Sequence, residues 1–581
     1  MTLLFSLSNP FRRNEVDLEN RSAFLIPRHV IDAEISVGGV GAADFDAVAD
    51  AFLGGKVWEK KVLWLYGTRI AALNGVDANG EYIYRTVEPR IDAEMRQLIN
   101  FISGNRSLLL MDTGKGANAE EYIETKTRDF IERHWGWVNS GLMTRALYYI
   151  KKEFVGIGRL DVLLADERIE DVTISGKGQS VYVQLSGGEE TREGYYSTDI
   201  QPSAHDYDNL LLRIGQKSGI TPNYLTPILD GTMQSNHDRV NMVYGDQVSP
   251  AGGSCTIRRV KDTPLSIADL IVAREMNVEM AAWLWYVVEK GASGLIFGST
   301  GSGKTTLLNT ILFSIPYPKK VVVIEDTREL RMPNDTNWSS GITRIPSSQQ
   351  PGYESIRLHD QLVSALRQRP DYIVVGEIRG REAYTLFDAM STGHVGYGTL
   401  HAGGLEDMQN RLANDPNAEG SMYVPLALQN SMDFALHVSQ VILSEGGTHQ
   451  RRRVLNIWEN KPVEFREHGT AGLNISPEFV KDRLGNGLFS YSSATDTFEC
   501  PSGQMLDGYL VDMFASREGK THGEALRDLN RRAVVLNYIV AERAHLSNLD
   551  MHLEVNYYSK TGKLKDKWLK YSANVPYAGG I

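Results

Sequence analysis

A glycine-rich run that ends in lysine and threonine has the clearest chemistry in this 581-residue sequence. Residues 298–305 read GSTGSGKT and match the pattern G-x-x-x-x-G-K-[ST] in full. Glycines let successive backbone N–H groups face phosphate oxygens, Lys304 adds a positive charge, and the hydroxyl of Thr305 can bind Mg²⁺. A strand-like stretch, 294–297, precedes the run and an apolar helical pattern, 306–313, follows it, so we expect a nucleotide-binding loop and not a flexible turn. The residues expected to bind the nucleotide are Gly298, Ser299, Thr300, Gly301, Ser302, Gly303, Lys304, Thr305 and Thr306.

Polar side chains follow three more strand-like stretches, and their types suit phosphate chemistry. They are Glu325 after 321–324, Glu377 after 371–376 and His401 after 395–400. Glu325 could align and deprotonate an attacking water, Glu377 could support Mg²⁺ and the water, and His401 could hydrogen-bond a γ-phosphate. An acid after a strand is otherwise often a helix cap or a surface turn, and a lone histidine often packs in a core. Because the carboxyl ends of parallel strands meet at one edge of a sheet, we favour the catalytic interpretation for all three.

The elements that must position these side chains alternate regularly after about residue 278. Apolar runs end at Phe297, Ile324, Val375 and Leu400, and a helical pattern follows each run. That alternation is typical of a parallel sheet with crossover helices, which gives an α/β fold class. Before it, a helical pattern over 142–154 and short strand-like runs indicate a small α+β domain.

The patterning divides the chain into five segments. We expect a mixed α/β domain over 1–135 and an α+β domain over 136–262, followed by a linker, 263–277, and a P-loop domain over 278–460. The remaining residues, 461–581, are expected to form a partly helical C-terminal extension, for which the sequence indicates no role.

Composition excludes several classes of protein. Lys and Arg number 61 against 72 for Asp and Glu, and the net charge of −11 argues against a main role in coating nucleic acid. A hydrophobic fraction of 42% excludes wholesale disorder. Two separate cysteines, Cys255 and Cys500, exclude a disulfide framework and a four-cysteine zinc site. No apolar run reaches the roughly 18–20 residues that span a bilayer and the first residues do not resemble a signal peptide, so we expect a cytoplasmic protein.

Four sequence boxes together resemble those of the secretion-superfamily ATPases, the hexameric motors of type II secretion, type IV pili and related DNA-transfer systems. The boxes are GSTGSGKTT (298–306), IEDTRELRMP (324–333), RPDYIVVGEIRGREA (369–383) and TGHVGYGTLHA (392–402). The residues of the third box resemble those of the archaeal branch of this family, which assembles archaella and archaeal pili. The resemblance covers about 155–460 and implies a RecA-like P-loop motor domain, preceded by a small PAS-like α+β domain and a further mixed N-terminal domain.

The resemblance also implies ligands and partners. ATP with Mg²⁺ would be bound, and arginines of the domain before the motor would reach the nucleotide. The matching positions are Arg239 and Arg258, with Arg213 as a weaker match. Members of the family form homohexamers and act on a polytopic platform protein in the cytoplasmic membrane. We therefore expect an ATP hydrolase that forms a homo-oligomer, meets the membrane peripherally through this partner and binds no stable nucleic acid.

The expected output is assembly of a type IV pilus-like or archaellum filament. The nearest alternative is a motor of the same family for protein export or DNA transfer, and another is a nucleotide-binding scaffold with negligible hydrolysis. The complete acidic and histidine set argues against the scaffold, since binding alone does not need Glu325. Three consecutive arginines, Arg451 to Arg453, could face lipid headgroups or line a solvated strand edge.

Overall fold

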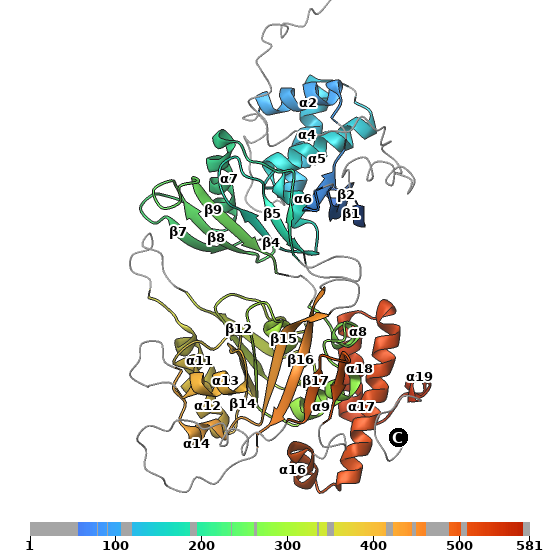
Figure 1. Cartoon of the computed structure of the whole chain (residues 1–581). Helices are drawn as coiled ribbons and strands as arrows, with labels where there is room; N and C mark the ends of the chain where they lie inside the picture. The colour runs from blue at the N-terminus through green and yellow to red at the C-terminus, as the bar shows by residue number, and fades with distance from the viewer. Residues whose placement is uncertain are drawn as a thin grey trace, which may run out of the picture. The chain divides into compact units, whose positions relative to one another are not determined.

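Two compact units make up the chain, Met1–Lys261 and Asp262–Ile581 (Figure 1). Parts of the predicted first and last segments, among them 1–55 and 461–486, lie outside the described residues. The computed structural model describes residues 56–77, 79–89, 91–105, 119–136, 138–185, 194–233, 235–260, 264–333, 336–344, 354–413, 422–443, 449–460, 487–500 and 508–572.

A nine-stranded sheet forms the centre of the described part of the N-terminal unit. Its strand order is β1-β2-β3-β6-β5-β4-β9-β8-β7, and neighbours run antiparallel except β3 and β6, which meet in parallel at Ile83 and Ser197. The strands are β1 (Lys56–Leu65), β2 (Thr68–Val76), β3 (Tyr82–Val87), β4 (Ile169–Ile174), β5 (Tyr182–Leu185), β6 (Gly194–Ser197), β7 (Ile228–Thr232), β8 (Arg239–Tyr244) and β9 (Gly253–Arg258).

One hydrophobic core joins the two N-terminal segments that the sequence pattern separates. Ile70 of β2, Leu147 of α5 and Ile257 of β9 belong to the same cluster of buried side chains. Sequence periodicity does not reveal this, because β3 and β6 are distant in the chain and pair only in the folded unit. The helices of this unit are α2 (Ala93–Gly104), α4 (Ala119–His134), α5 (Ser140–Phe154), α6 (Leu160–Leu164) and α7 (Ala204–Lys217).

The C-terminal unit has its own sheet, in the order β12-β11-β13-β14-β10-β15-β16-β17-β18. The first six strands in this order, from β12 through β11, β13, β14 and β10 to β15, are parallel. Strands β16, β17 and β18 continue the sheet in antiparallel pairing. The predicted parallel sheet is therefore right for the strands that carry the motifs, whereas the whole sheet is mixed. Too few residues separate β15 from β16 for the crossover that a parallel pair needs. The strands are β10 (Gly294–Gly298), β11 (Val321–Glu325), β12 (Trp338–Ile342), β13 (Tyr372–Val375), β14 (Val395–His401), β15 (Phe434–Leu443), β16 (His449–Glu459), β17 (Phe489–Ser492) and β18 (Thr497–Glu499).

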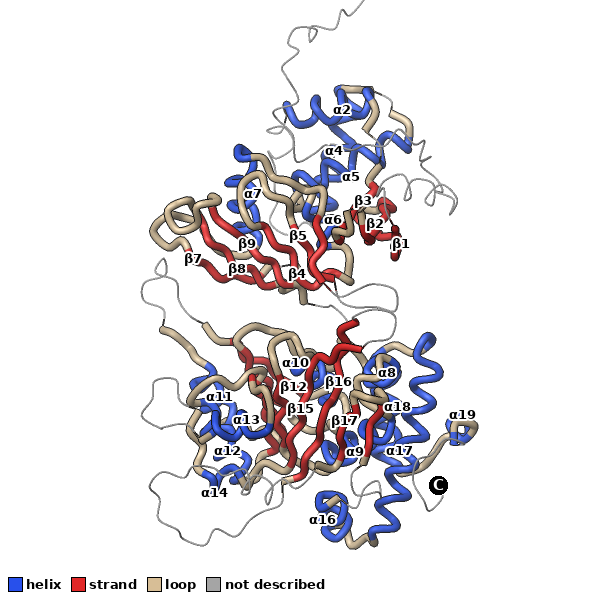
Figure 2. The backbone as a smooth tube through the Cα atoms, viewed as in Figure 1, coloured by secondary structure: helices blue, strands red, loops and turns tan. Residues whose placement is uncertain are grey.

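Helices cover both faces of this sheet (Figure 2). Successive residues of β10 point to opposite faces, so that Ile296 belongs to one core cluster while Leu295 and Phe297 belong to the other. This double burial explains the continuous apolar runs of the parallel strands, which show no alternation. The helices are α8 (Ile267–Val272), α9 (Val278–Glu289), α10 (Lys304–Leu312), α11 (Leu358–Leu366), α12 (Glu382–Ser391), α13 (Leu405–Leu412), α14 (Leu426–Gln429), α16 (Tyr509–Arg517), α17 (His522–Glu542), α18 (Asn548–Thr561) and α19 (Asp566–Leu569), with a 3-10 turn, η2, over Arg543–His545.

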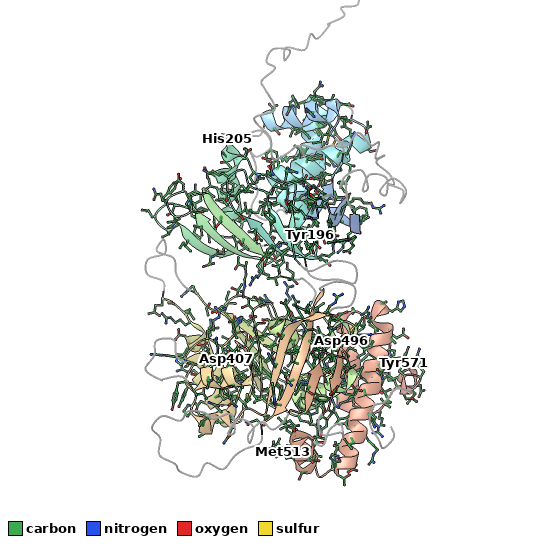
Figure 3. The ribbon with its side chains drawn as sticks, in the orientation of Figure 1. Tyr196, His205, Asp407, Asp496, Met513 and Tyr571 are labelled. Carbon is green, nitrogen blue, oxygen red and sulfur yellow. The ribbon has the colours of Figure 1, made fainter. Side chains whose placement is uncertain are left out.

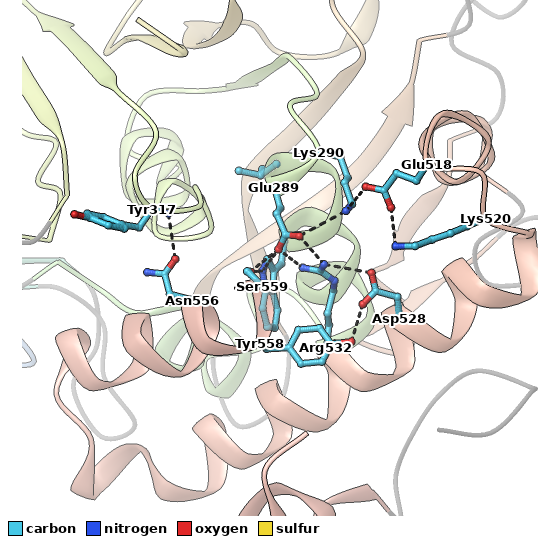
Figure 4. Close-up of polar contacts among 12 residues, drawn as sticks. Glu289, Lys290, Tyr317, Glu518, Lys520, Asp528, Arg532, Asn556, Tyr558 and Ser559 are labelled. Atoms are coloured by element: carbon cyan, nitrogen blue, oxygen red, sulfur yellow. Dashed lines mark hydrogen bonds and ion pairs between the residues drawn. The ribbon is translucent and has the colours of Figure 1, made fainter. Parts of the chain in front are cut away.

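The C-terminal helices are part of the same core and are joined to α9 by a buried arginine (Figure 4). Arg532 of α17 donates to both carboxylate oxygens of Glu289, at 2.8 and 3.0 Å, and to Asp528 at 3.3 Å. Its guanidinium lies 4.7 Å from the centre of the Trp285 ring. Burial opposes the positive charge, but Glu289 and Asp528 together raise the pKa of Arg532. Although α17 is 21 residues long, neither it nor any other helix in the described part of the chain is apolar enough to cross a bilayer.

Replacing Arg532 by methionine is expected to lower the free energy of unfolding of the C-terminal unit by about 3–5 kcal/mol, because Glu289 and Asp528 would stay buried without their cation. Urea unfolding followed by tryptophan fluorescence measures the change, since Trp285 lies beside this cluster. Arg411→Ala is the control, because its ion pair with Asp407 lies at the surface of the same unit, where about 0.3–0.5 kcal/mol is expected. Equal losses for the two variants would contradict the assignment.

Candidate functional site

The glycine-rich run forms a loop between β10 and α10. Gly298 is the last residue of β10, and Gly303 immediately precedes the first residue of α10. Gly301 and Gly303 have φ angles of 74° and 95°, a left-handed conformation in which other residues are strained. A Cβ atom on Gly298 would lie 2.0 Å from the backbone oxygen of Val438 in β15, so only glycine fits there. Backbone N–H groups in such a loop, backed by a helix N-terminus, form a binding site for an anion.

Lys304 supplies the positive charge of this loop. Its Nζ donates to the backbone oxygens of Gly298 at 3.1 Å and Ser299 at 2.7 Å, so the ammonium group folds back over the loop. Burial lowers the pKa of Lys304, although the carboxylate of Glu377 opposes the shift. A bound phosphate would offer this ammonium group a charged acceptor in place of two neutral carbonyls, which favours anion binding.

His401 connects the loop to Glu377. It ends β14, which pairs in parallel with β10 so that His401 stands opposite Gly298. Its Nε2 lies 3.1 Å from Oε1 of Glu377, and its Nδ1 lies 3.3 Å from the hydroxyl of Thr300 and 3.4 Å from Nζ of Lys304. Burial and then the charge of Lys304 lower the pKa of His401 despite the opposing carboxylate of Glu377. A lowered pKa favours the neutral ring, in which a proton on Nε2 would donate to Glu377 and Nδ1 would face Lys304 as an acceptor.

Basic groups surround the carboxylate of Glu377. Arg379 donates to Oε2 of Glu377 at 2.6 Å and lies 3.7 Å from Asp326. Burial alone would raise the pKa of Glu377, but the hydrogen bond and charge of Arg379, together with His401 and Lys304, lower it. The side chain is thus ionised at neutral pH and suited to hold a cation or a cation-bound water.

Glu325 ends β11 and is 2% exposed. Its Oε1 accepts hydrogen bonds from the backbone N–H groups of Glu329 at 3.0 Å and Leu330 at 2.9 Å, which fix the side chain in place. A Cβ atom on Gly376 would lie 3.0 Å from Cγ of Glu325, so the glutamate reaches the residue next to Glu377. The adjacent strands β11, β13, β14 and β10 therefore bring all the predicted acidic, histidine and loop residues of this unit to one edge of the sheet.

The predicted arginines lie in the other unit. Arg239 of β8 and Arg258 of β9 are cross-strand partners, and Arg258 in turn stands opposite Asp171 of β4. The Nε atom of Arg258 donates to Asp171 at 3.1 Å, with 58% of the arginine side chain exposed. Arg213 lies 3.6 Å from Glu153. That Arg239 and Arg258 reach a nucleotide stays a prediction.

Three residues outside the four sequence boxes lie against the loop. Gln440 of β15 donates to the backbone oxygen of Gly301 at 3.3 Å. A Cβ atom on Gly303 would lie 3.2 Å from Cδ of Arg452 and 3.4 Å from Oε1 of Glu275. Burial raises the pKa of Glu275 to about 7, against the opposing charges of Arg452 and Arg453. The sequence does not link these residues, because the pairing of Gln440 with Arg452 is known only once the β15–β16 register is known.

Arg453 has a structural role that the sequence does not suggest. It is 2% exposed and donates to both carboxylate oxygens of Asp496, at 2.9 and 3.1 Å; Figure 3 labels this aspartate. Of the predicted arginine run, Arg452 thus faces the loop and Arg453 is buried. A lipid-facing patch or a solvated strand edge formed by all three arginines is therefore wrong.

A family model described as type II/IV secretion system protein matches residues 238–451, a stretch that holds the loop and the acidic and histidine residues. The uncharacterized protein MJ1287 of Methanocaldococcus jannaschii is 33% identical, over 46% of this chain and 89% of its own length. The uncharacterized protein MJ0900 of the same organism is 36% identical, over 53% of this chain and 53% of its own length, so the matched part spans about half of that relative.

Among solved structures, the ATPase DotB of Legionella pneumophila is 16% identical to this chain. The superposition covers 67% of this chain and 91% of DotB, with a TM-score of 0.37.

Arg452→Ala is expected to weaken binding of a nucleoside triphosphate about tenfold, because a guanidinium group beside Gly303 can donate to a bound phosphate. Titration with a fluorescent ATP analogue measures the affinity. Arg451→Ala is the matched control, since the preceding residue of the same strand points to the opposite face. An unchanged affinity for Arg452→Ala, or an equal loss for both variants, would remove Arg452 from the site.

Proposed function

The chain belongs to the family of type II/IV secretion system proteins, and we propose that it is an ATPase motor that drives assembly of a type IV pilus-like or archaellum filament. The observation that supports the proposal most is the meeting of the glycine-rich loop, Glu325, Glu377 and His401 at one sheet edge. Nucleotide binding alone would require the loop, whereas hydrolysis requires a group that can activate water.

The loop and its neighbours fit Mg·ATP. The backbone N–H groups of 299–304 would bind phosphate oxygens, and Lys304 would neutralise the β- and γ-phosphates. The hydroxyl of Thr305 and the ionised carboxylate of Glu377 would hold Mg²⁺, which prefers oxygen ligands and would offset charge on the phosphates. Arg379 would keep the carboxylate of Glu377 ionised for this role.

Glu325 would act as the general base. It would accept a proton from a water molecule as the water oxygen attacks the γ-phosphorus. The bond between that phosphorus and the oxygen of ADP breaks, and the products are ADP and inorganic phosphate. The backbone N–H groups of Glu329 and Leu330 hold one carboxylate oxygen of Glu325 by hydrogen bonds, and this also fixes the orientation of its other oxygen.

His401 would report the γ-phosphate to Glu377. Its Nδ1 contacts Lys304 and Thr300, the loop groups that a phosphate would attract, while its Nε2 contacts Glu377. A phosphate that draws Lys304 away from Nδ1 would therefore change the hydrogen bonding of Glu377 through one imidazole ring.

The motor would be a homohexamer in which Arg239 and Arg258 reach the nucleotide and couple hydrolysis to movement of the N-terminal unit. For Arg258 this movement would replace its ion pair with Asp171 by a contact to phosphate. The protein would be cytoplasmic and would act on a polytopic platform protein of the membrane. A motor for protein export or DNA transfer is the alternative, and the net charge of −11 favours filament assembly or export over stable contact with nucleic acid.

ATP turnover by the purified protein tests the proposal. Glu325→Gln is expected to lower kcat by about 10²–10⁴-fold while ATP still binds, because the amide cannot accept the proton. Asp326→Asn is the matched control, since this exposed neighbour lies 3.7 Å from Arg379 but has no part in the proposed proton transfer. A wild-type rate no higher than that of Glu325→Gln, with lipid and partner present, would exclude the motor.

His401→Ala is expected to reduce the preference for ATP over ADP about tenfold, because the link between the γ-phosphate and Glu377 is lost. Competition binding of the two nucleotides measures the preference. His394→Ala is the control, since His394 comes from the same sequence box but contacts the backbone oxygen of Ala389 instead. A preference that is unchanged in His401→Ala would contradict the sensor role.

A further inference from the structure

Helix α18 carries a stripe of exposed apolar side chains, which we name the outer stripe: Leu549, Leu553 and Tyr557. Their exposed fractions are 47%, 49% and 38%. The three residues lie four apart and therefore share one side of the helix. In a helix that serves only the fold, the apolar side faces the core, so a second apolar side in contact with solvent needs another explanation.

The inner side of α18 already anchors the helix to the unit. Its core residues are Met551, Val555 and Tyr558. His552 Nδ1 lies 3.0 Å from the backbone oxygen of Phe313, and the Asn556 side chain accepts a hydrogen bond from the N–H of Tyr317 at 3.3 Å. These contacts hold the helix without the outer stripe.

Lysines gather where the outer stripe ends. Residues 557–572 contain five lysines and one aspartate, a local charge of 5 − 1 = +4 in a chain with a net charge of −11. Lys560 lies one turn beyond Tyr557 on the same side of the helix, and its ammonium group is 4.8 Å from the centre of the Tyr317 ring. Lys563 follows at the helix end and is exposed.

The remaining lysines of this group contact acidic residues of the C-terminal helices. Lys565 and Lys567 form ion pairs with Glu554, each at 2.5 Å, and Lys570 lies 3.4 Å from Glu542. Lys565 also lies 4.3 Å from the centre of the Tyr557 ring, so it borders the outer stripe together with Lys560 and Lys563.

We propose that the outer stripe and the lysines at its end dock the protein on a bilayer surface rich in anionic lipid. Leucines would enter the boundary between headgroups and acyl chains, and Tyr557 with Tyr317 would lie at the level of the headgroups. The ammonium groups of Lys560 and Lys563 would reach anionic headgroups while their stems stay on the apolar side. A protein partner matches this surface less well, because lysines are depleted in protein interfaces. This surface lies outside the motor motifs, so the inference does not depend on ATP hydrolysis.

Co-sedimentation of the full chain with vesicles tests the proposal. One set of vesicles is phosphatidylcholine alone, and the other is phosphatidylcholine with phosphatidylglycerol in equal parts. The variants are Leu553→Ser and the double variant Lys560→Gln/Lys563→Gln. Their matched controls in the N-terminal unit are Leu225→Ser, at a leucine that is 94% exposed, and Lys126→Gln/Lys177→Gln, in which Lys126 also lies over a tyrosine ring.

The unaltered protein is expected to bind the anionic vesicles, and to bind them less tightly as the salt concentration is raised. It is expected to bind vesicles of phosphatidylcholine alone only weakly. Each lysine removed is expected to lower the partition coefficient about fivefold, and the control variants are expected to bind as the unaltered protein does. Circular dichroism and thermal unfolding establish that every variant is folded, and ATP turnover is measured beside binding, so that loss of either property is seen separately.

Two results would overturn the proposal. The first is failure of the folded full chain to bind anionic vesicles, or binding that the α18 variants leave unchanged. The second is a change in self-association of the α18 variants, measured by light scattering, with vesicle binding unaffected, which would assign the outer stripe to a second copy of the chain.

Discussion

The charge of Lys304 inside a loop of backbone groups is the constraint on which the C-terminal unit depends. A partly buried ammonium group is costly unless acceptors surround it, and the carbonyls of Gly298 and Ser299 provide them. The charge of the Glu377 carboxylate offsets that of Lys304, and Arg379 in turn keeps the pKa of Glu377 low. Charged side chains that contact one another at hydrogen-bond distances need a rigid framework to hold them. The parallel strands supply this rigidity, because His401 stands in register with Gly298 and both faces of the sheet are covered by core side chains.

The sequence sufficed for the part of this arrangement that is local. A glycine-rich loop between a strand and a helix is recognisable because glycine, lysine and threonine each have a role at a fixed spacing. The strand ends at Glu325 and His401 were predictable because double burial makes the strands continuous apolar runs. The rule that ligands bind at the carboxyl edge of a parallel sheet then predicted that these residues meet, and the structure places them on adjacent strands.

What could not be predicted depends on pairings between distant residues. The antiparallel continuation β16 to β18, the contact of Arg452 with Gly303 and the burial of Arg453 against Asp496 all follow from the β15–β16 register. Charge pattern alone made the three arginines look equivalent. In the same way, the sequence does not distinguish Arg532 from a surface arginine of a long helix, and only its contacts with Glu289 and Trp285 reveal that α17 packs into the core of the C-terminal unit.

The inner side of α18 contacts the segment that follows α10, whereas its outer side carries the outer stripe. On the inner side His552 and Asn556 contact the backbone of Phe313 and Tyr317, the residues that follow the P-loop helix α10 (Figure 4 shows the Tyr317–Asn556 contact). Asn548 donates to the backbone oxygen of Pro264, in the segment that enters the unit, and Thr310 of α10 donates to Leu265 beside it. Directional hydrogen bonds tolerate little change in length, so a shift of α10 would be resisted or followed by α18. The loop proposed to bind phosphate and the stripe proposed to bind lipid are therefore connected by one helix, and a movement at either one has a short, hydrogen-bonded route to the other.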